Sequence, residues 1–213
     1  MSPAEFVETL RLERGSAILR TKENAVAREA MNAAVRGGFK VIEFTLTIPG
    51  VYELIAEFAS KPGLIVGAGT ILTAEEAQRA VDAGARFLVS PVVDKDVIQK
   101  AHELNVACIP GCSTPTEMLT AYRLGAPLQK LFPAPGTGPE WVRQALGPLP
   151  MLNIVPTSGV NPQNAEAYLD AGATAVGFTT SLFSLDVLAK RNYLEIETRA
   201  KEMTQLIAKH RKP

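Results

Sequence analysis

The chain of 213 residues has no long apolar run, and no stretch approaches the roughly 20 residues that a membrane-spanning helix needs. Its first eight residues carry acidic side chains and lack the apolar core of a secretory signal. No charge block, low-complexity tract or Ser/Gly-rich linker divides the sequence. We therefore expect a cytoplasmic protein with one domain over residues 1–213.

The sequence also has few cysteines and histidines, and its formal net charge at pH 7 is zero. Cys108 and Cys112 are the two cysteines, and their spacing fits neither a zinc pair nor a redox CxxC motif, which favours a reducing compartment. The two histidines, His102 and His210, both fall in helix-like segments, so we expect no metal site. With 22 basic and 22 acidic residues, we expect neither a nucleic-acid partner nor a membrane partner.

A strand followed by a helix is the pattern that repeats along the chain. Helix starts are marked by capping boxes at Thr73–Glu76 and Thr114–Glu117. Eight such units in this length predict a closed (β/α)₈ barrel, with an open doubly wound sheet as the alternative. The glycines at 67 and 69 lack the third glycine of a dinucleotide fingerprint. The expected strands are 17–20, 41–46, 64–70, 86–91, 106–111, 126–134, 153–159 and 175–180; the expected helices are 21–36, 51–60, 73–84, 95–104, 114–124, 141–146, one after 161–162, and 185–209 with a break near 192.

Lys130 stands in the middle of an apolar strand pattern, between Leu128 and Phe132. Lysine is among the residues least often buried. Desolvation would lower its pKa by up to about 3–5 units, and the neutral amine would then attack ketones to form a Schiff base. The alternative is an edge-strand lysine that extends to water.

Active residues of such barrels lie at the carboxyl ends of the strands. In the second strand, alternation places Glu43 on the inner face, opposite the apolar Ile42 and Phe44. An interior carboxylate and an interior lysine are each costly alone, so we expect Glu43 and Lys130 to meet directly or through water. A structural ion pair is the alternative. Position at the carboxyl ends of the expected strands selects Arg20, the run from Glu43 to Thr47 including Thr45, Thr70, Ser90, Pro91, Pro110, Gly111, Lys130, Phe132, Thr157, Ser158, Gly159, Thr179 and Thr180.

The loops after the seventh and eighth strands are where many barrels bind phosphate. Here they contain Thr157–Asn161 and Gly177–Ser181, whose hydroxyls and backbone amides suit an anion. Ordinary helix capping by the same residue types is the alternative.

Six motifs, in this order, resemble the 2-keto-3-deoxy-6-phosphogluconate (KDPG) / 4-hydroxy-2-oxoglutarate (KHG) aldolase family over nearly the whole chain. They are Ile42–Leu46, Val66–Thr70, Ser90–Pro91, Ile109–Gly111 with Thr114–Glu117, Lys130–Ala134 and Val155–Asn161.

The resemblance implies a class I aldolase on a barrel. Such an enzyme would use no metal or other cofactor, would form a homotrimer, and would cleave KDPG or a related 2-keto-4-hydroxy acid to pyruvate and an aldehyde such as glyceraldehyde 3-phosphate or glyoxylate. Lys130 matches the Schiff-base lysine and Glu43 the general acid/base. The remaining matches are Thr70 and Thr157 for the pyruvyl carboxylate pocket, Pro91 and Phe132 around the pyruvyl carbons, and Ser158, Gly159, Thr179 and Thr180 for the phosphate site.

Three segments depart from the family pattern. Thr47 stands where many members carry arginine, Ser158 replaces a glycine, and Thr179–Thr180 replaces Gly-Ser. We expect Arg20 to take over anion binding from the missing arginine; a solvent-facing loop arginine is the alternative. Two other functions stay open: a phosphate-binding barrel isomerase or epimerase, and a non-catalytic barrel that binds a small acid.

Overall fold

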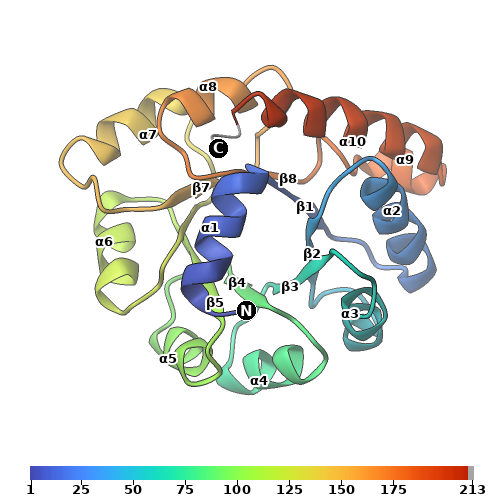
Figure 1. Cartoon of the computed structure of the whole chain (residues 1–213), viewed down its shortest axis with the longest axis horizontal. Coiled ribbons are helices and arrows are strands. Elements are labelled where there is room, and N and C mark those ends of the chain that lie inside the picture. The colour runs from blue at the N-terminus through green and yellow to red at the C-terminus, as the bar shows by residue number, and fades with distance from the viewer. Residues whose placement is uncertain (211–213) are drawn as a thin grey trace.

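The structure is a computed structural model that describes residues 1–210, so the last three residues of the expected 1–213 domain lie outside it. Eight parallel strands run in the order β7-β6-β5-β4-β3-β2-β1-β8 in this range, and a bridge between Thr157 and Gly177 joins the two outer strands. The predicted closed barrel is therefore confirmed, and the open sheet is wrong (Figure 1). The strands are β1 (Gly15–Leu19), β2 (Val41–Thr45), β3 (Ile65–Gly69), β4 (Phe87–Ser90), β5 (Ala107–Cys112), β6 (Gln129–Leu131), β7 (Ile154–Pro156) and β8 (Val176–Phe178).

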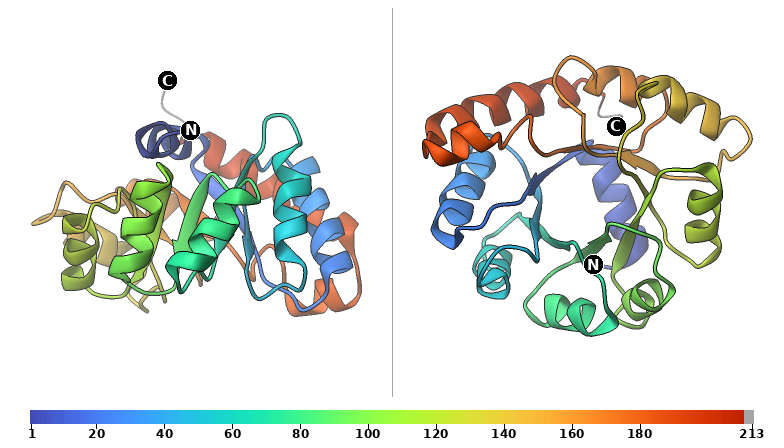
Figure 2. Two further views of the ribbon diagram at one scale, coloured as in Figure 1. Left: turned by 90° about the horizontal axis from the view of Figure 1, so that it is seen from below. Right: turned by 180° about the vertical axis from the view of Figure 1, so that it is seen from behind.

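Helices surround the barrel as an outer layer, as the two further views in Figure 2 show. A helix follows every strand, and the predicted break near Asn192 separates the last two helices. The helices are α1 (Pro3–Glu13), α2 (Asn24–Arg36), α3 (Val51–Ala59), α4 (Ala74–Asp82), α5 (Lys95–Glu103), α6 (Pro115–Arg123), α7 (Pro139–Leu146), α8 (Ala165–Asp170), α9 (Leu185–Ala189) and α10 (Tyr193–Ala208).

Helix α1 precedes the first strand and was not predicted. Its start has a complete capping box between Ser2 and Glu5, with Pro3 in the first turn, so the sequence did contain the signal. The helix lies across one end of the barrel (Figures 1 and 2), where the fully buried Phe6 ring stacks on Phe87 with centroids 4.5 Å apart. Side chains of α1 thereby fill the amino-terminal end of the barrel interior and leave the other end open.

Alternation along β2 divides its side chains between two cores, as predicted. Ile42 and Phe44 pack in the layer between strands and helices, whereas Val41 joins the smaller cluster inside the barrel together with Phe6. Glu43 shares the inner face with Val41. The strand pattern therefore directs this carboxylate into the barrel.

Two expected elements have different bounds. The lysine strand is shorter than the expected 126–134, because prolines flank β6 and proline has no N–H for the ladder. The helix expected from Asn161–Pro162 begins at Ala165, because Asn161 accepts hydrogen bonds from the amides of the next residues and forms a turn first.

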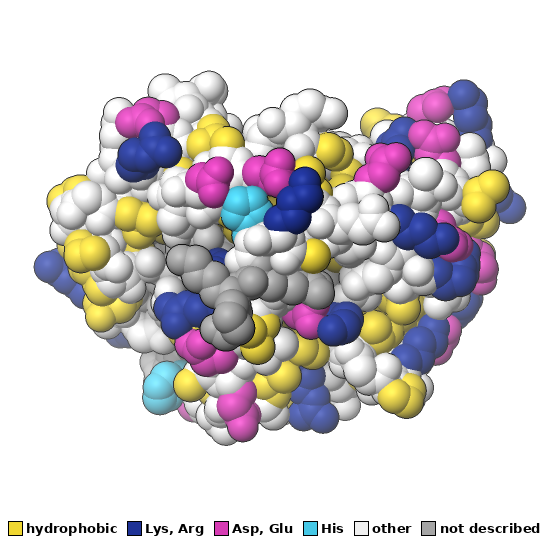
Figure 3. Space-filling view, turned by 45° about the horizontal axis from the view of Figure 1, so that its top comes forward, with side chains coloured by type: hydrophobic (Ala, Val, Ile, Leu, Met, Phe, Trp, Pro, Cys, Tyr) yellow, Lys and Arg dark blue, Asp and Glu magenta, His cyan; other side chains and the backbone are white. Residues whose placement is uncertain are grey.

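Charges of both signs are interspersed on the surface. On the face shown in Figure 3, Lys and Arg side chains alternate with Asp and Glu side chains, and no large patch has one sign. Among the described residues, no helix combines the length and the apolar character required to cross a membrane.

Candidate active site

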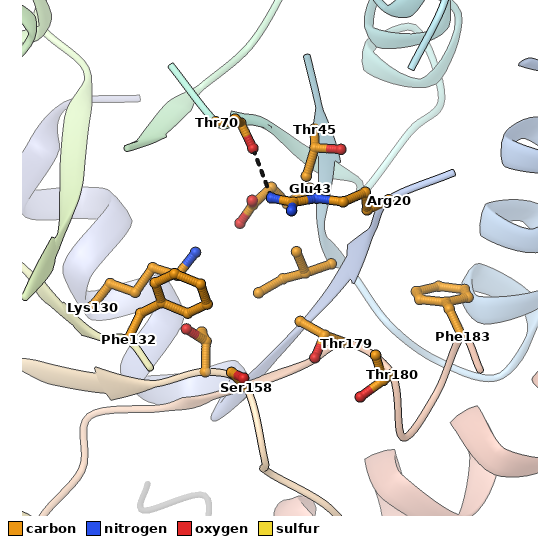
Figure 4. A pocket seen from close by; sticks show the side chains of 12 residues that line it. Arg20, Glu43, Thr45, Thr70, Lys130, Phe132, Ser158, Thr179, Thr180 and Phe183 are labelled. Atoms are coloured by element: carbon orange, nitrogen blue, oxygen red, sulfur yellow. Dashed lines mark hydrogen bonds between the residues drawn. The ribbon is translucent and has the colours of Figure 1, made fainter. Parts of the chain in front are cut away.

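A cavity of about 190 Å³ lies at the carboxyl ends of the strands. Residues from β1, β2, β6 and the segments that follow β3, β7 and β8 line it, so sequence positions more than 150 residues apart meet there (Figure 4). The lining consists of Ile18, Arg20, Glu43, Thr45, Thr70, Lys130, Phe132, Thr157, Ser158, Thr179, Thr180 and Phe183.

Glu43 is 3% exposed, and its carboxylate points into the cavity. A Cβ atom at Gly69 would collide with its Oε1, so the glycine of β3 is what leaves room for the carboxylate. The glycines at 67 and 69 thus serve packing, because a Cβ at Gly67 would collide with the Phe87 ring. Burial raises the pKa of Glu43, and the charges of Lys130 and Arg20 only partly oppose this effect.

Lys130 lies in β6, and its amine opens onto the same cavity. Burial lowers the pKa of Lys130; Arg20 acts in the same direction, and Glu43 opposes both. The Nζ atom lies 4.7 Å from the centroid of the Phe132 ring. The predicted interior position is confirmed: the amine faces the cavity and does not extend to bulk water.

Lys130 and Glu43 are directed toward each other across the cavity (Figure 4). Within the described part of the chain they do not form a direct salt bridge, since no ion pair within 4.0 Å joins them. Each charge nevertheless influences the pKa of the other. Of the two predicted arrangements, the direct contact is wrong, and the gap leaves room for a water molecule or a substrate atom.

Arg20 extends over the cavity from the end of β1. Its Nη2 donates a hydrogen bond of 3.2 Å to Oγ1 of Thr70, so the guanidinium and this hydroxyl form one polar group at the mouth. The side chain is exposed, yet it lines the cavity and contributes to the pKa of both Glu43 and Lys130. Arg20 is thus exposed to solvent, as the alternative of a loop arginine expects, and its guanidinium also borders the cavity.

Thr157 supplies a hydroxyl that has no partner. The residue is 2% exposed, and its Oγ1 is buried without a hydrogen bond to any described residue. Such an atom costs about 1–3 kcal/mol unless a ligand or water satisfies it. Gly177 leaves room for this side chain, because a Cβ at that position would collide with Thr157 Cγ2.

Two cavity residues have backbone conformations that are uncommon for residues with side chains. Thr70 has φ 64° and Ser158 has φ 66°. A β-branched residue in this region is strained by about 1–3 kcal/mol, and such strain concentrates at functional sites. Both residues project polar side chains into the cavity from opposite parts of the barrel.

Ten of the polar, aromatic and charged residues selected at the strand ends line the cavity. Selected positions outside the lining include Thr47, Ser90, Pro91, Pro110, Gly111 and Gly159. Thr47 instead shares a hydrogen bond of 2.8 Å with the lining residue Thr45. Sequence reasoning missed Ile18 and Phe183, which line the cavity beside Arg20 and Thr180. Ile18 could have been found from the alternation in β1, whereas Phe183 lies in an irregular segment without a repeat that would reveal its direction.

Metal ligands do not gather at this site. Among residues 1–210 there is no group of three or more His, Cys, Asp or Glu side chains placed to hold a metal ion. The cysteines are buried, and burial raises the pKa of both Cys108 and Cys112 to about 12.

Comparison with known proteins gives consistent matches. Residues 7–199 match the family described as KDPG and KHG aldolase. A probable 2-dehydro-3-deoxy-6-phosphogalactonate aldolase of Rhizobium meliloti (strain 1021) is 35% identical over 78% of this chain and 80% of its own length. The KHG/KDPG aldolase of Escherichia coli (strain K12) is 32% identical over 81% of this chain and 82% of its own.

Solved structures agree with the sequence matches. The crystal structure of 2-keto-3-deoxy-6-phospho-gluconate aldolase from Zymomonas mobilis ATCC 29191 superposes with a TM-score of 0.84 at 28% identity. The alignment covers 97% of this chain and 98% of that one.

The class of protein follows from the barrel, the cavity at its mouth and these matches. It is a pyruvate-dependent aldolase, a lyase that cleaves carbon–carbon bonds. This excludes the isomerase and the non-catalytic barrel as the main function. Within the class, the chain belongs to the KDPG and KHG aldolase family.

Proposed function

We propose that the chain cleaves a 2-keto-4-hydroxy acid to pyruvate and an aldehyde through a Schiff base on Lys130. The observation that carries this proposal is the pairing of Lys130 and Glu43 on one cavity, with the pKa of the amine lowered and that of the carboxyl raised. A lysine that loses its proton easily is a nucleophile at neutral pH, and a carboxyl that holds its proton can give it up to a leaving group.

The first half of the reaction joins enzyme and substrate. The neutral Lys130 amine attacks C2 of the ketone and forms a carbinolamine. Glu43, through a water molecule or the carbinolamine hydroxyl, delivers the proton with which that hydroxyl leaves as water, and the nitrogen lone pair then forms the iminium. General acid–base help of this kind contributes about 10²–10⁴-fold in rate.

The second half breaks the carbon–carbon bond. Glu43, again through water, takes the proton of the C4 hydroxyl; the C4–O electrons form the aldehyde carbonyl, and the C3–C4 pair moves into the iminium to give an enamine. The proton that Glu43 took is delivered to C3, which restores the iminium. Water then adds to C2, and pyruvate and the free amine are released. Electrons and protons balance without an external oxidant or reductant.

The carboxylate of the substrate is assigned to Arg20, Thr70 and Thr157. Arg20 and Thr70 already form one polar group, and the Thr157 hydroxyl lacks a partner. Phe132, beside the amine, contributes an apolar wall for the pyruvyl carbons. Thr45, Ser158, Thr179 and Thr180 face the rest of the substrate. Three proposed site residues lie outside the lining. Thr47 positions Thr45 through their shared hydrogen bond, and Pro91 and Gly159 shape the neighbouring loops.

Borohydride trapping tests the Schiff base. Incubation with pyruvate and borohydride should attach a reduced adduct to Lys130, to be located by peptide mass spectrometry. Lys130→Ala should abolish both the adduct and the turnover, whereas Lys22→Ala, an exposed lysine outside the cavity, should preserve both. Thr157→Val should reduce turnover far less than Lys130→Ala. Full turnover by Lys130→Ala would refute the mechanism.

The role of Arg20 has a separate test. A hydrogen bond to a charged group contributes about 1.5–3 kcal/mol, so Arg20→Ala should raise KM for the keto acid roughly 10- to 100-fold. Lys22→Ala is again the control. An unchanged KM would remove Arg20 from the carboxylate site.

We also propose that the whole chain acts as one domain in the cytoplasm and assembles as a homotrimer. Support for assembly comes from a fold neighbour with a TM-score of 0.83 and 25% identity, a cube-shaped protein cage designed by fusing symmetric oligomeric domains; the alignment covers 92% of this chain and 73% of that one. Light scattering after size-exclusion chromatography should give three times the mass of the 22.8 kDa chain. A monomer mass would contradict the trimer.

A further inference from the structure

The segment between β8 and α9, residues 179–184, forms one wall of the cavity. Thr179, Thr180 and Phe183 line the cavity from this segment (Figure 4). We propose that Arg199, a residue of α10 that does not line the cavity, is a positioning residue that holds this segment in the conformation that receives the aldehyde part of the substrate. The inference rests on the function proposed above and adds to it a residue that acts without touching the substrate.

The guanidinium of Arg199 bonds the segment at two points. Its Nη1 donates a hydrogen bond of 3.4 Å to the carbonyl oxygen of Ser181 and one of 3.2 Å to Oγ of Ser184. Within residues 1–210, no other side chain from outside the segment donates a hydrogen bond to it. The Ser181 carbonyl is thereby held toward α10, and a cation links this helix to the wall of the cavity.

Arg199 is itself fixed by Glu195, one helical turn earlier. Oε1 of Glu195 accepts hydrogen bonds from Nη2 at 2.7 Å and from Nε at 3.1 Å, so the planar guanidinium is held with Nη1 directed at the segment. Asn192 caps the start of α10 and accepts a hydrogen bond of 3.3 Å from the Glu195 amide. The Arg199 side chain is 29% exposed, so solvent screens these bonds only in part.

The segment contains a buried group that weakens its own conformation. Oγ of Ser181 is buried without a hydrogen bond to any described residue, and such a hydroxyl favours an arrangement that returns it to water. Leu182 and Phe183 are buried, and their amides donate to the Thr179 carbonyl at 3.1 and 2.8 Å, which anchors the apolar side of the segment. The bonds from Arg199 oppose a rearrangement on the polar side, because hydrogen bonds from a charged donor are about twice as strong as neutral ones.

Loss of these bonds should lower the fraction of enzyme molecules whose segment is ready for the substrate. The apparent affinity for a ligand falls in proportion to that fraction. Lys130 and Glu43 are held by β6 and β2, and Arg199 makes no hydrogen bond to either strand. The chemical steps should therefore continue once the substrate is bound, so Arg199 should affect KM much more than kcat.

Arg199→Met tests the proposal, because it removes the donors and keeps a long side chain. KM for a 2-keto-4-hydroxy acid should rise about tenfold, as expected for the loss of a hydrogen bond from a charged group, while kcat should stay within about twofold. Arg36→Met is the matched control, because it breaks another ion pair of α10, that of Arg36 with Glu197 at 2.8 Å, and Arg36 does not line the cavity. An unchanged KM in Arg199→Met, or an equal rise in Arg36→Met, would overturn the inference.

Trapping of pyruvate with borohydride provides a second measurement on the same variant. Pyruvate occupies the Lys130 end of the cavity and lacks the aldehyde part of the substrate. The pyruvate concentration that gives half-maximal trapping should therefore be the same in Arg199→Met and in the wild type, which also shows that the variant is folded. A tenfold increase in this concentration would mean that Arg199 acts on the whole barrel and not on the segment, and would contradict the proposal.

Failure of this inference and failure of the Schiff-base mechanism give different results. If the wild type traps pyruvate on Lys130 and Arg199→Met keeps the wild-type KM, the proposed function stands and the role of Arg199 is wrong. If the wild type forms no adduct with pyruvate and cleaves no 2-keto-4-hydroxy acid, the proposed function fails and this inference fails with it.

Discussion

Gly69→Ala should impair catalysis by displacing Glu43, the proposed general acid and base. The Cβ atom of this alanine would lie only 2.7 Å from Cδ of Glu43, whereas ordinary contact begins near 3.4 Å. The carboxyl carbon has to move by about 0.7 Å, and a misplacement of about 1 Å can cost on the order of 10²-fold in rate. We therefore expect kcat to fall roughly 10- to 100-fold.

The assay couples pyruvate release to lactate dehydrogenase and follows NADH oxidation. Gly136→Ala is the matched control, because its Cβ would meet nothing within 4 Å and its φ is ordinary. Replacing glycine by alanine within a strand normally stabilises by roughly 0.5–1 kcal/mol, so a stable but slow Gly69→Ala enzyme is the expected result. Wild-type kcat in this variant would refute the view that Gly69 positions Glu43.

Three further predictions concern stability and reactivity. Phe6→Ala should lower the free energy of unfolding by about 3–5 kcal/mol in urea titrations, because it removes a fully buried ring that stacks on Phe87; a loss below 1 kcal/mol would contradict this role of α1. Lys130→Met should raise the free energy of unfolding at neutral pH, because the pKa of Lys130 is lower in the folded state than in the unfolded state. The free energy of unfolding of the wild type therefore rises with pH up to the unfolded pKa of about 10.4. The stability gained by Lys130→Met should shrink over that pH range. A gain independent of pH would argue against it. Cys108 and Cys112 should not react with Ellman's reagent at pH 8 until denaturant is added, since burial raises the pKa of each thiol to about 12; rapid labelling of the folded enzyme would contradict this.

Much of the fold could be predicted because it depends on local patterns. The apolar strands and the capping boxes at Thr73 and Thr114 identified the eight units, and alternation along β2 gave the direction of Glu43. These signals are short-range, so a single sequence contains them in full.

What could not be predicted depends on contacts between distant segments. The hydrogen bond from Arg20 to Thr70 joins residues 50 positions apart, and no periodicity in the sequence predicts it. The same holds for Phe183, whose direction is set by an irregular turn after β8. The separation of Lys130 and Glu43 also depends on barrel geometry, so the sequence left open whether they meet directly or through water, and the structure has a gap between them.

Helix α1 closes one end of the barrel, so the cavity opens at the other end. Between this helix and the Lys130–Glu43 level, the barrel interior holds a void of only about 10 Å³, barely enough for one water molecule. Within the described part of the chain, this void is too small for keto acid or aldehyde to pass. Both molecules therefore enter and leave on the side of the barrel where Arg20 lies.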